Sequence, residues 1–226
     1  MSPSIARRVA AEFVGSALLL MAVVGSGIMG QQLSGGNSAL ALLANAFATG
    51  AMLWVLIRAL RPISGAHLNP LVSLGDAGLP WRELPAYVGA QVTGALAGVM
   101  TAHAMFAQPL LALSTRARSG GAQMFSEFVA TFGLVLLLRL VARFRSEALA
   151  SSVAAYVASA YWFTASTAFA NPAATIGRMV TDTFSGIRPR DVPGFLVAEL
   201  AGALAAMALS VWLLRDTRRE PLGERS

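Results

Sequence analysis

Three segments of this chain recur, in the same order, later in the sequence. Three aligned pairs mark the matches, which lie 115, 102 and 108 residues apart: Glu12 of AEFVGSALLL with Glu127 of SEFVATFGLVLL, Asn69 of GAHLNPLVSLG with Asn171 of AFANPAATIG, and Gln91 of GAQVTGALAG with Glu199 of VAELAGALAA. Chance similarity between helices rich in Ala, Leu and Gly could produce one such match, but hardly three in register. The sequence therefore predicts an internal duplication, which constrains the fold more than any single motif.

Six stretches are apolar enough to cross a bilayer, whose core of roughly 30 Å needs about 20 residues in a helix. They are 9–29, 39–59, 86–106, 122–142, 150–168 and 193–214. Only 12% of the 226 residues are charged, against about 25% in an ordinary soluble domain. We therefore predict an all-α integral membrane protein. The first stretch follows Arg7 and Arg8 as a signal peptide would, but Glu12 at its start and the lack of a convincing small-residue cleavage site argue against removal.

Each copy of the duplication holds three of the six predicted spans. An odd number of spans forces the second copy to enter the membrane upside down, so an inverted three-helix repeat follows. We predict a single channel domain over residues 1–226, with one repeat at 5–106, the other at 122–214, and a cytoplasmic tail at 215–226. Small residues at helix-packing spacing, such as Gly94 and Gly98 or Gly202 and Ala206, favour close helix contacts.

The basic residues, all of them Arg, predict the orientation. Twelve of the 17 fall on the side of the two termini and five on the other side, which favours cytoplasmic N- and C-termini. The twelve are Arg7, Arg8, Arg58, Arg61, Arg82, Arg139, Arg143, Arg145, Arg215, Arg218, Arg219 and Arg225; the five are Arg116, Arg118, Arg178, Arg188 and Arg190. Because these residues lie between apolar blocks rather than in a stripe, the pattern does not indicate a nucleic-acid partner.

An Asn-Pro pair lies between the second and third span of each copy. Pro suits the first turn of a helix and Asn is a good N-cap, so Asn69-Pro70 and Asn171-Pro172 are each predicted to begin a half-helix. Inverted symmetry brings both positive helix ends, with their Asn donors, to the membrane centre. The irregular backbone before each cap survives at that depth only beside a wet cavity or buried in protein. One Asn-Pro pair could merely break a helix, but two at matching positions indicate a path for small neutral hydroxylated solutes that opposes cations.

Other functions find less support in the sequence. With no Cys and only two His, neither a thiolate metal site nor a His cluster is expected, and we predict no metal, no cofactor and no catalytic residues. An intramembrane enzyme would need a nucleophile and base that are not recognisable here. A secondary transporter with an inverted repeat stays open as an alternative, although it would need ionisable groups for coupling beyond the two Glu-opened helices.

These motifs, over nearly the full length, resemble the aquaporin and aquaglyceroporin family. The resemblance rests on SGAHLNPLVSLG, ANPAATIG, the two EFV openings and AQVTGALAG. It implies six spans plus two re-entrant half-helices, a pore within each protomer, a homotetramer in membrane lipid, and a bacterial inner-membrane location. It also implies that Glu12 and Glu127 are buried acceptors that tie down the re-entrant loops, although either could instead be a charge at the end of a span that reaches to the interface.

The departures from the family pattern bear on the solute. Leu71 stands where the first motif usually has Ala, and Ala174 stands where an Arg usually follows the second motif. By counting back from each Asn, the other filter positions of the family fall on Thr49, Ser159 and Ala168, all small and none aromatic. This predicts a wider, less cationic filter than a water-only channel has. The chain looks most like the bacterial aquaglyceroporins of arsenic-resistance operons, partly through TIGRMVTDTFSGIRP, which implies passage of arsenite as As(OH)3, glycerol and water; an orthodox water channel is the alternative.

Two charged or titratable residues near the motifs have open roles. Arg178, four residues after Ala174, is either a displaced filter cation or the partner of Asp182 at i,i+4, and the pairing is the favoured interpretation. His67 either lines the cytoplasmic mouth or holds the loop. His103, in the third span, is expected to serve packing.

Overall fold

The structure is a computed structural model that describes residues 3–215. Its eight α-helices follow one order twice: two long helices, one short helix and a further long helix. They are α1 (Ile5–Leu33), α2 (Ser38–Ser64), α3 (Pro70–Gly75), α4 (Leu84–Met105), α5 (Gly121–Phe144), α6 (Leu149–Phe163), α7 (Pro172–Arg178) and α8 (Val192–Leu213). Short 3-10 turns precede α4, α6 and α8, namely η1 (Trp81–Glu83), η2 (Ser146–Ala148) and η3 (Pro189–Asp191).

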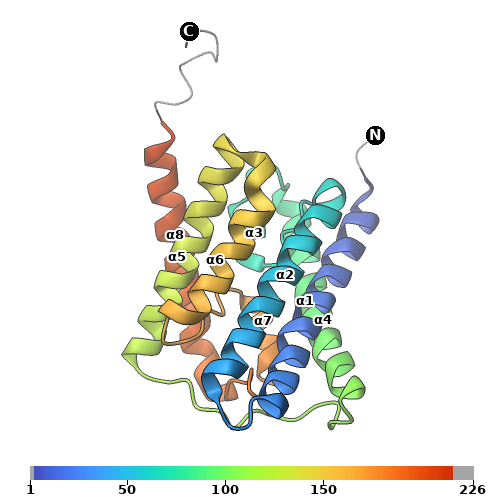
Figure 1. Ribbon diagram of the computed structural model, residues 1–226. Helices are drawn as coiled ribbons and strands as arrows, with labels where there is room; N and C mark the ends of the chain where they lie inside the picture. Colours follow the sequence, from blue (N-terminus) through green and yellow to red (C-terminus); the bar gives the residue numbers. More distant parts are fainter. Residues whose placement is uncertain (1–2, 216–226) are drawn as a thin grey trace.

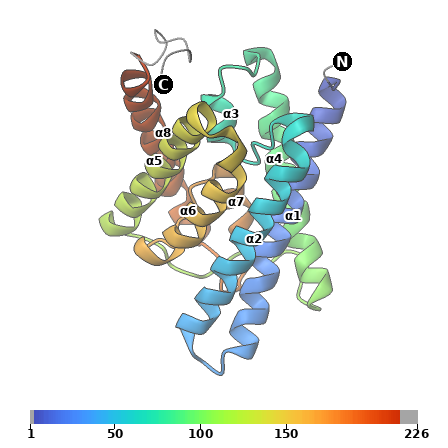
Figure 2. The ribbon, with the colours of Figure 1, turned by 45° about the horizontal axis from the view of Figure 1, so that its top comes forward.

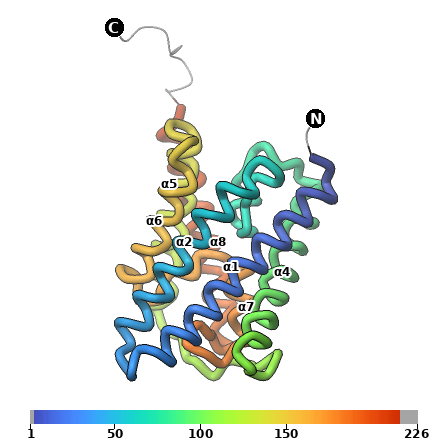
Figure 3. The backbone as a smooth tube through the Cα atoms, turned by 45° about the vertical axis from the view of Figure 1, so that its right-hand side comes forward, coloured from blue at the N-terminus to red at the C-terminus, as the bar shows by residue number. Residues whose placement is uncertain are grey.

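The six long helices run side by side, and the two short ones lie among them (Figure 1). In the first repeat α1 packs against α2 and α4, and in the second α5 packs against α6 and α8, while contacts between α2 and α6 join the halves. The α1–α4 pair and the α5–α8 pair form opposite sides of the bundle (Figures 2 and 3). The start of α1 and the end of α8 lie at one end of the molecule (Figure 1). Because α3 follows the end of α2 and α7 follows the end of α6, the short helices enter from opposite ends.

The prediction of six long helices and two half-helices is confirmed for the described residues, with one boundary wrong. The span predicted at 150–168 is too long at its end. The helix α6 stops at Phe163, and an irregular segment runs from there to Asn171. By length and composition, four helical segments could cross a membrane: Ile5–Leu33, Ser38–Ser64, Gly121–Phe144 and Pro189–Leu213. The predicted tail 215–226 lies outside the described residues except for Arg215.

Glycines bring the helix pairs into close contact. A Cβ atom at Gly94 would overlap the carbonyl oxygen of Phe13, and one at Gly98 would overlap that of Ala17, so α4 lies directly on the backbone of α1. The second repeat has the same arrangement, because a Cβ at Gly202 on α8 would overlap the carbonyl oxygen of Phe128 on α5. These contacts fix the frame that holds the half-helices, since small residues allow helix backbones to approach where lipid supplies no hydrophobic drive.

Replacing Gly98 by Ala should destabilise the folded protein, because the added methyl group must push α4 away from α1. Overpacking of this kind typically costs about 1–3 kcal/mol. Thermal unfolding in detergent or liposomes measures the effect. Gly89→Ala on the same helix is the matched control, because nothing lies within 4 Å of a Cβ there; equal melting temperatures for the two variants would contradict the assignment of Gly98 to the helix contact.

Candidate functional site

Each half-helix begins at an Asn-Pro pair, as the sequence predicts. Asn69 Oδ1 accepts the Leu71 N–H at 2.9 Å, and Asn171 Oδ1 accepts the Ala173 N–H at 3.0 Å. Pro70 and Pro172 occupy the first helical position, where a missing N–H costs nothing. The side-chain amide of each Asn is thereby held with its Nδ2 group turned away from its own helix.

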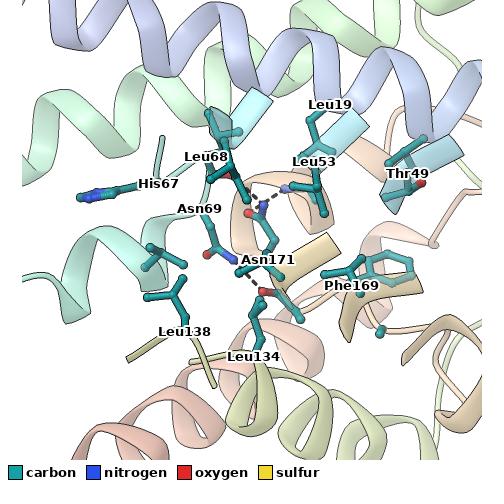
Figure 4. A pocket seen from close by; sticks show the side chains of 18 of the residues that line it. Leu19, Thr49, Leu53, His67, Leu68, Asn69, Leu134, Leu138, Phe169 and Asn171 are labelled. Atoms are coloured by element: carbon teal, nitrogen blue, oxygen red, sulfur yellow. Dashed lines mark hydrogen bonds between the residues drawn. The ribbon is translucent and has the colours of Figure 1, made fainter. Parts of the chain in front are cut away.

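The two Asn side chains bind each other's loops. Asn69 Nδ2 donates to the carbonyl oxygen of Ala170 at 2.8 Å, and Asn171 Nδ2 donates to that of Leu68 at 2.8 Å, as the dashed lines in Figure 4 show. An amide nitrogen carries two N–H groups, so each Asn keeps one further donor beside the cavity. The exchange joins residues about 100 positions apart in the sequence and places the two half-helix N-termini together in the interior.

The backbone before each Asn is held in a strained form. Ala66 and Leu68 in the first loop have φ values of 51° and 52°, and Ala168 and Ala170 in the second have 46° and 48°. A residue other than Gly in the left-handed region costs of order 1–3 kcal/mol, so the surroundings must compensate. The carbonyl oxygen of Leu68, within the first loop, faces the centre, where it accepts the Asn171 side chain.

Two buried carboxylates supply that compensation. Glu12 accepts the N–H groups of His67 and Leu68, at 2.9 and 2.7 Å. Glu127 accepts those of Phe169 and Ala170, at 2.9 and 2.8 Å. Both Glu side chains are fully buried, so these bonds satisfy groups that lipid could not. Of the two roles that the sequence left open for these residues, the structure shows the one that the family resemblance implies, a buried acceptor for the loop.

A second polar layer ties each half-helix to the long helix that follows. Gln91 Nε2 on α4 donates to Glu12 Oε2 at 2.8 Å and to Ser73 Oγ at 2.9 Å. In the second repeat Glu199 Oε1 on α8 accepts the hydroxyl of Thr175 at 2.6 Å and the Asn171 N–H at 3.3 Å. Ser73 and Thr175 stand four residues after their respective Asn, so the layer obeys the repeat.

Two cavities meet beside the Asn pair. One, of about 80 Å³, has Asn69, Asn171 and Arg178 among its lining residues, and the other, of about 450 Å³, has Leu71 and Asp76. They share lining residues of which Ala66, His67 and Val72 come from the first loop and α3. Apolar side chains, including Leu19, Leu53, Leu134 and Leu138, surround the Asn pair in Figure 4. The two adjoining cavities, hereafter the path, have a polar strip of donors and carbonyl oxygens on otherwise apolar walls.

The structure brings Thr49, Ala168 and Ala174 together in the first cavity, but not Ser159. Ser159 is exposed on the outside of α6 and bonds the Ala155 carbonyl of its own helix. The prediction that it lines the filter is wrong, because counting back from Asn171 assumed a longer connection than the chain has. Tyr161 takes the place, with its hydroxyl 3.2 Å from Thr49 Oγ1.

Tyr161 and Phe169 are the functional residues that sequence reasoning missed. Both line the first cavity, so the prediction that this region holds no aromatic residue is also wrong. The helical spacing of Val153, Val157 and Tyr161, each four residues apart and all lining the cavity, is the signal that could have located Tyr161.

Arg178 does not pair with Asp182. Its side chain is 2% exposed, lies over the Phe169 ring with its guanidinium carbon 3.3 Å from the ring centroid, and donates from Nε to the Ser185 carbonyl. Asp182 instead accepts the N–H and hydroxyl of Thr115, at 2.9 and 3.0 Å. The favoured i,i+4 interpretation is therefore wrong. Arg178 lines the first cavity one helical turn beyond Ala174.

A second buried Arg shares the same aromatic ring. Arg118, from the segment between α4 and α5, lies 4.9 Å from the Phe169 centroid and donates to the carbonyl oxygens of Gly186 and Ser166. Burial, reinforced by the nearby charges of Arg178 and Arg116, lowers the pKa of Arg118 to about 9. It therefore stays charged at pH 7, and this end of the path is electropositive.

The opposite mouth holds His67. Its Nε2 lies 3.2 Å from Asp76 Oδ2 and its Nδ1 lies 3.1 Å from Ser73 Oγ, and the hydrogen bond with His67 lowers the pKa of Asp76. His67 also lines both cavities. The sequence left open whether His67 lines the mouth or holds the loop, and in the structure it does both. His103 is buried and bonds Thr181 Oγ1 at 2.7 Å, away from either cavity lining.

Chemically, the path offers hydrogen-bond donors and acceptors to a small solute. Within residues 3–215 no group of three or more His, Asp and Glu side chains could hold a metal ion. Two half-helices that meet head to head within an inverted helical repeat define a membrane channel of the re-entrant type.

The comparisons with known proteins agree with this class. The sequence pattern of the major intrinsic protein family matches residues 1–159, and the chain belongs to that family. It is 54% identical over 215 residues to the aquaglyceroporin AqpS of Rhizobium meliloti, covering 94% of this chain and 92% of that protein. It is 31% identical over 198 residues to aquaporin NIP2-3 of Zea mays, covering 82% and 64%.

A solved structure agrees with the fold. The aquaglyceroporin of Plasmodium falciparum superposes with a TM-score of 0.73 at 20% identity, covering 91% of this chain and 95% of that one. The protein is thus a multi-pass membrane channel for small neutral solutes rather than an enzyme, and the resemblance seen in the sequence is confirmed.

Replacing Glu127 by Leu should destabilise the fold strongly, because two buried backbone N–H groups would lose their acceptor. Each such loss costs about 1–3 kcal/mol. The yield of folded protein and its thermal unfolding provide the measurement. Glu147→Leu, at an exposed carboxylate, is the control, and unchanged stability in Glu127→Leu would show that the loop does not depend on this carboxylate.

Proposed function

We propose that this chain is a passive channel of the bacterial plasma membrane that carries small neutral polyhydroxyl solutes, chiefly arsenite as As(OH)3 and glycerol, together with water. The observation that carries the proposal is the cavity beside the Asn69–Asn171 pair, where donors and carbonyl oxygens lie against otherwise apolar walls. Glycerol and As(OH)3 each present three hydroxyl groups without charge, so both suit a narrow path that exchanges hydrogen bonds with water.

In this proposal, four side chains limit the size of the solutes that can pass. Thr49, Ala168 and Ala174 are small, and Tyr161 closes the ring with a hydroxyl. With Ala at 174, no guanidinium occupies the narrowest level, which leaves more room than a filter with Arg there. Leu71, buried at the edge of the second cavity, adds bulk below the Asn pair without removing a hydrogen-bonding group.

Charge selection is assigned to Arg178. A buried guanidinium beside a pore, with a carbonyl rather than a carboxylate as its partner, presents an uncompensated positive charge to a passing ion. Together with the two half-helix N-termini it opposes cations. The functional alternative from the sequence, a displaced filter cation, is therefore the one we propose.

Assembly and orientation follow the same reasoning. We propose a homotetramer in which each protomer has its own pore, with both termini cytoplasmic and Arg178 at the outer mouth. The excess of Arg at the end where α1 begins supports this orientation.

Stopped-flow light scattering of proteoliposomes, with water, glycerol and arsenite in parallel, tests the function. All three should equilibrate down their gradients, whatever ion gradient is imposed. Passage of water alone would indicate an orthodox water channel, and solute accumulation driven by a second ion would indicate a transporter.

Replacing Ala174 by Arg should slow glycerol and arsenite more than water, because a guanidinium would fill the narrowest level of the path. We expect a loss of about tenfold or more for the larger solutes, equivalent to roughly 1.4 kcal/mol of barrier. The same vesicle assay measures the loss. Ser159→Ala, on the outside of α6, is the control and should leave all three rates unchanged. Unchanged glycerol and arsenite rates would remove Ala174 from the filter.

Replacing Arg178 by Gln should raise cation leakage through the channel while glycerol still passes. At an effective dielectric constant of about 20, a charge several ångströms away changes an ion's energy by a few kcal/mol, so the rise should be tenfold or more. Potassium or proton flux in vesicles provides the readout. Arg116→Gln removes an exposed charge near the same mouth and should have little effect; equal leakage in both variants would count against Arg178 as the charge filter.

A further inference from the structure

Glu199 is a buried carboxyl group that the pore geometry described above leaves unexplained. It is 0% exposed on α8, and its Oε1 contacts the pore-lining residue Asn171 and also Thr175. Its counterpart in the first repeat, Gln91, is an amide. The repeats therefore differ where a long helix is hydrogen-bonded to its half-helix: the first has an amide there and the second has a carboxyl group.

Glu199 has a second carboxyl group as its neighbour. Glu127, also 0% exposed, accepts the N–H groups of Phe169 and Ala170, and Glu199 accepts that of the next residue, Asn171. Three successive amides are thus held by two acids. Among the described residues no ion pair joins either acid to a cation, and the nearby positive charges are the buried guanidinium groups of Arg178, at the far end of α7, and Arg118.

The bonding pattern separates the two acids. Both oxygens of Glu127 accept short hydrogen bonds from backbone N–H groups, at 2.9 and 2.8 Å. Glu199 accepts one long N–H bond and one hydroxyl bond, and its Oε2 has no hydrogen-bond partner in residues 3–215. A bare, buried carboxylate oxygen next to another carboxylate is far more costly than a neutral acid.

We propose that Glu199 is a positioning residue that acts as an uncharged carboxylic acid, the counterpart of Gln91, and that it fixes Asn171 and Thr175 without placing a second negative charge at the half-helix. The N-terminus of α7 carries roughly half a positive charge. An ionised Glu199 would add a negative charge close to the Asn pair and would weaken the opposition of this half-helix to cations. The neutral form holds Asn171 and Thr175 without adding that charge.

The test compares three variants in proteoliposomes and rests on the proposed function. Glu199→Gln keeps the shape and Oε1 acceptor of the neutral acid, so glycerol flux and potassium exclusion should stay within about twofold of wild type. Glu199→Leu removes the acceptor from Asn171 and Thr175, so flux per folded channel should fall about tenfold or more. Glu147→Gln, which neutralises an exposed acid, is the matched control.

A second measurement reads the proton directly and needs no transport activity. Infrared spectra of the folded wild-type channel near pH 7 should contain the carbonyl band of a protonated carboxylic acid, and that band should vanish in Glu199→Gln but persist in Glu147→Gln. Because Glu199→Gln is isosteric, this result decides the question even where Glu199→Leu fails to fold.

The outcomes separate the two proposals. A wild-type channel that passes neither glycerol nor arsenite would refute the proposed function alone. A wild type that conducts while Glu199→Leu conducts equally well would refute the positioning role. Loss of flux in Glu199→Gln, or absence of the protonated band from wild type, would show that Glu199 works as a carboxylate and would overturn the inference.

Discussion

The structure depends on one reciprocal exchange of hydrogen bonds in the membrane interior. Asn69 donates to the loop that ends at Asn171, and Asn171 donates to the loop that ends at Asn69. Neither loop could be buried in the membrane interior by itself, because its backbone is irregular and strained. Each is completed by the other and by a buried Glu on a long helix. A channel results because the same exchange aims spare N–H donors and carbonyl oxygens at a common path.

In the proposed function, departures from the internal symmetry account for the selectivity. The paired Glu, Asn and helix-crossing Gly positions repeat faithfully, and they build the frame. The two mouths differ: one has His67 with Asp76, and the other has Arg118 and Arg178 on the ring of Phe169. In the proposed function, size is selected around Ala174 and charge one helical turn further out, at Arg178. This arrangement is consistent with a path wide enough for a polyol that still opposes cations.

The sequence predicts the frame well, because duplication and helical composition are local signals. Asn69, Asn171, Glu12 and Glu127 follow from matched motifs whose order the fold preserves. Ser159 fails because its position was counted through residues 164–170, which the structure shows to be irregular rather than helical. The Arg178 pairing fails for a tertiary reason: Thr115, from a distant segment, binds Asp182, and the Phe169 ring lies under the guanidinium. No periodicity encodes such contacts.

The absence of Cys from the sequence allows the central claim to be tested directly. A single Cys placed at Ala174 should react with a water-soluble thiol reagent in proteoliposomes, and the bulky adduct should block glycerol flux, because that side chain lines the path beside the second half-helix. A single Cys at Ser159, on the outside of α6, should leave flux unchanged after the same treatment. Block at Ser159→Cys with none at Ala174→Cys, or no block at either, would contradict a path running between the two half-helices.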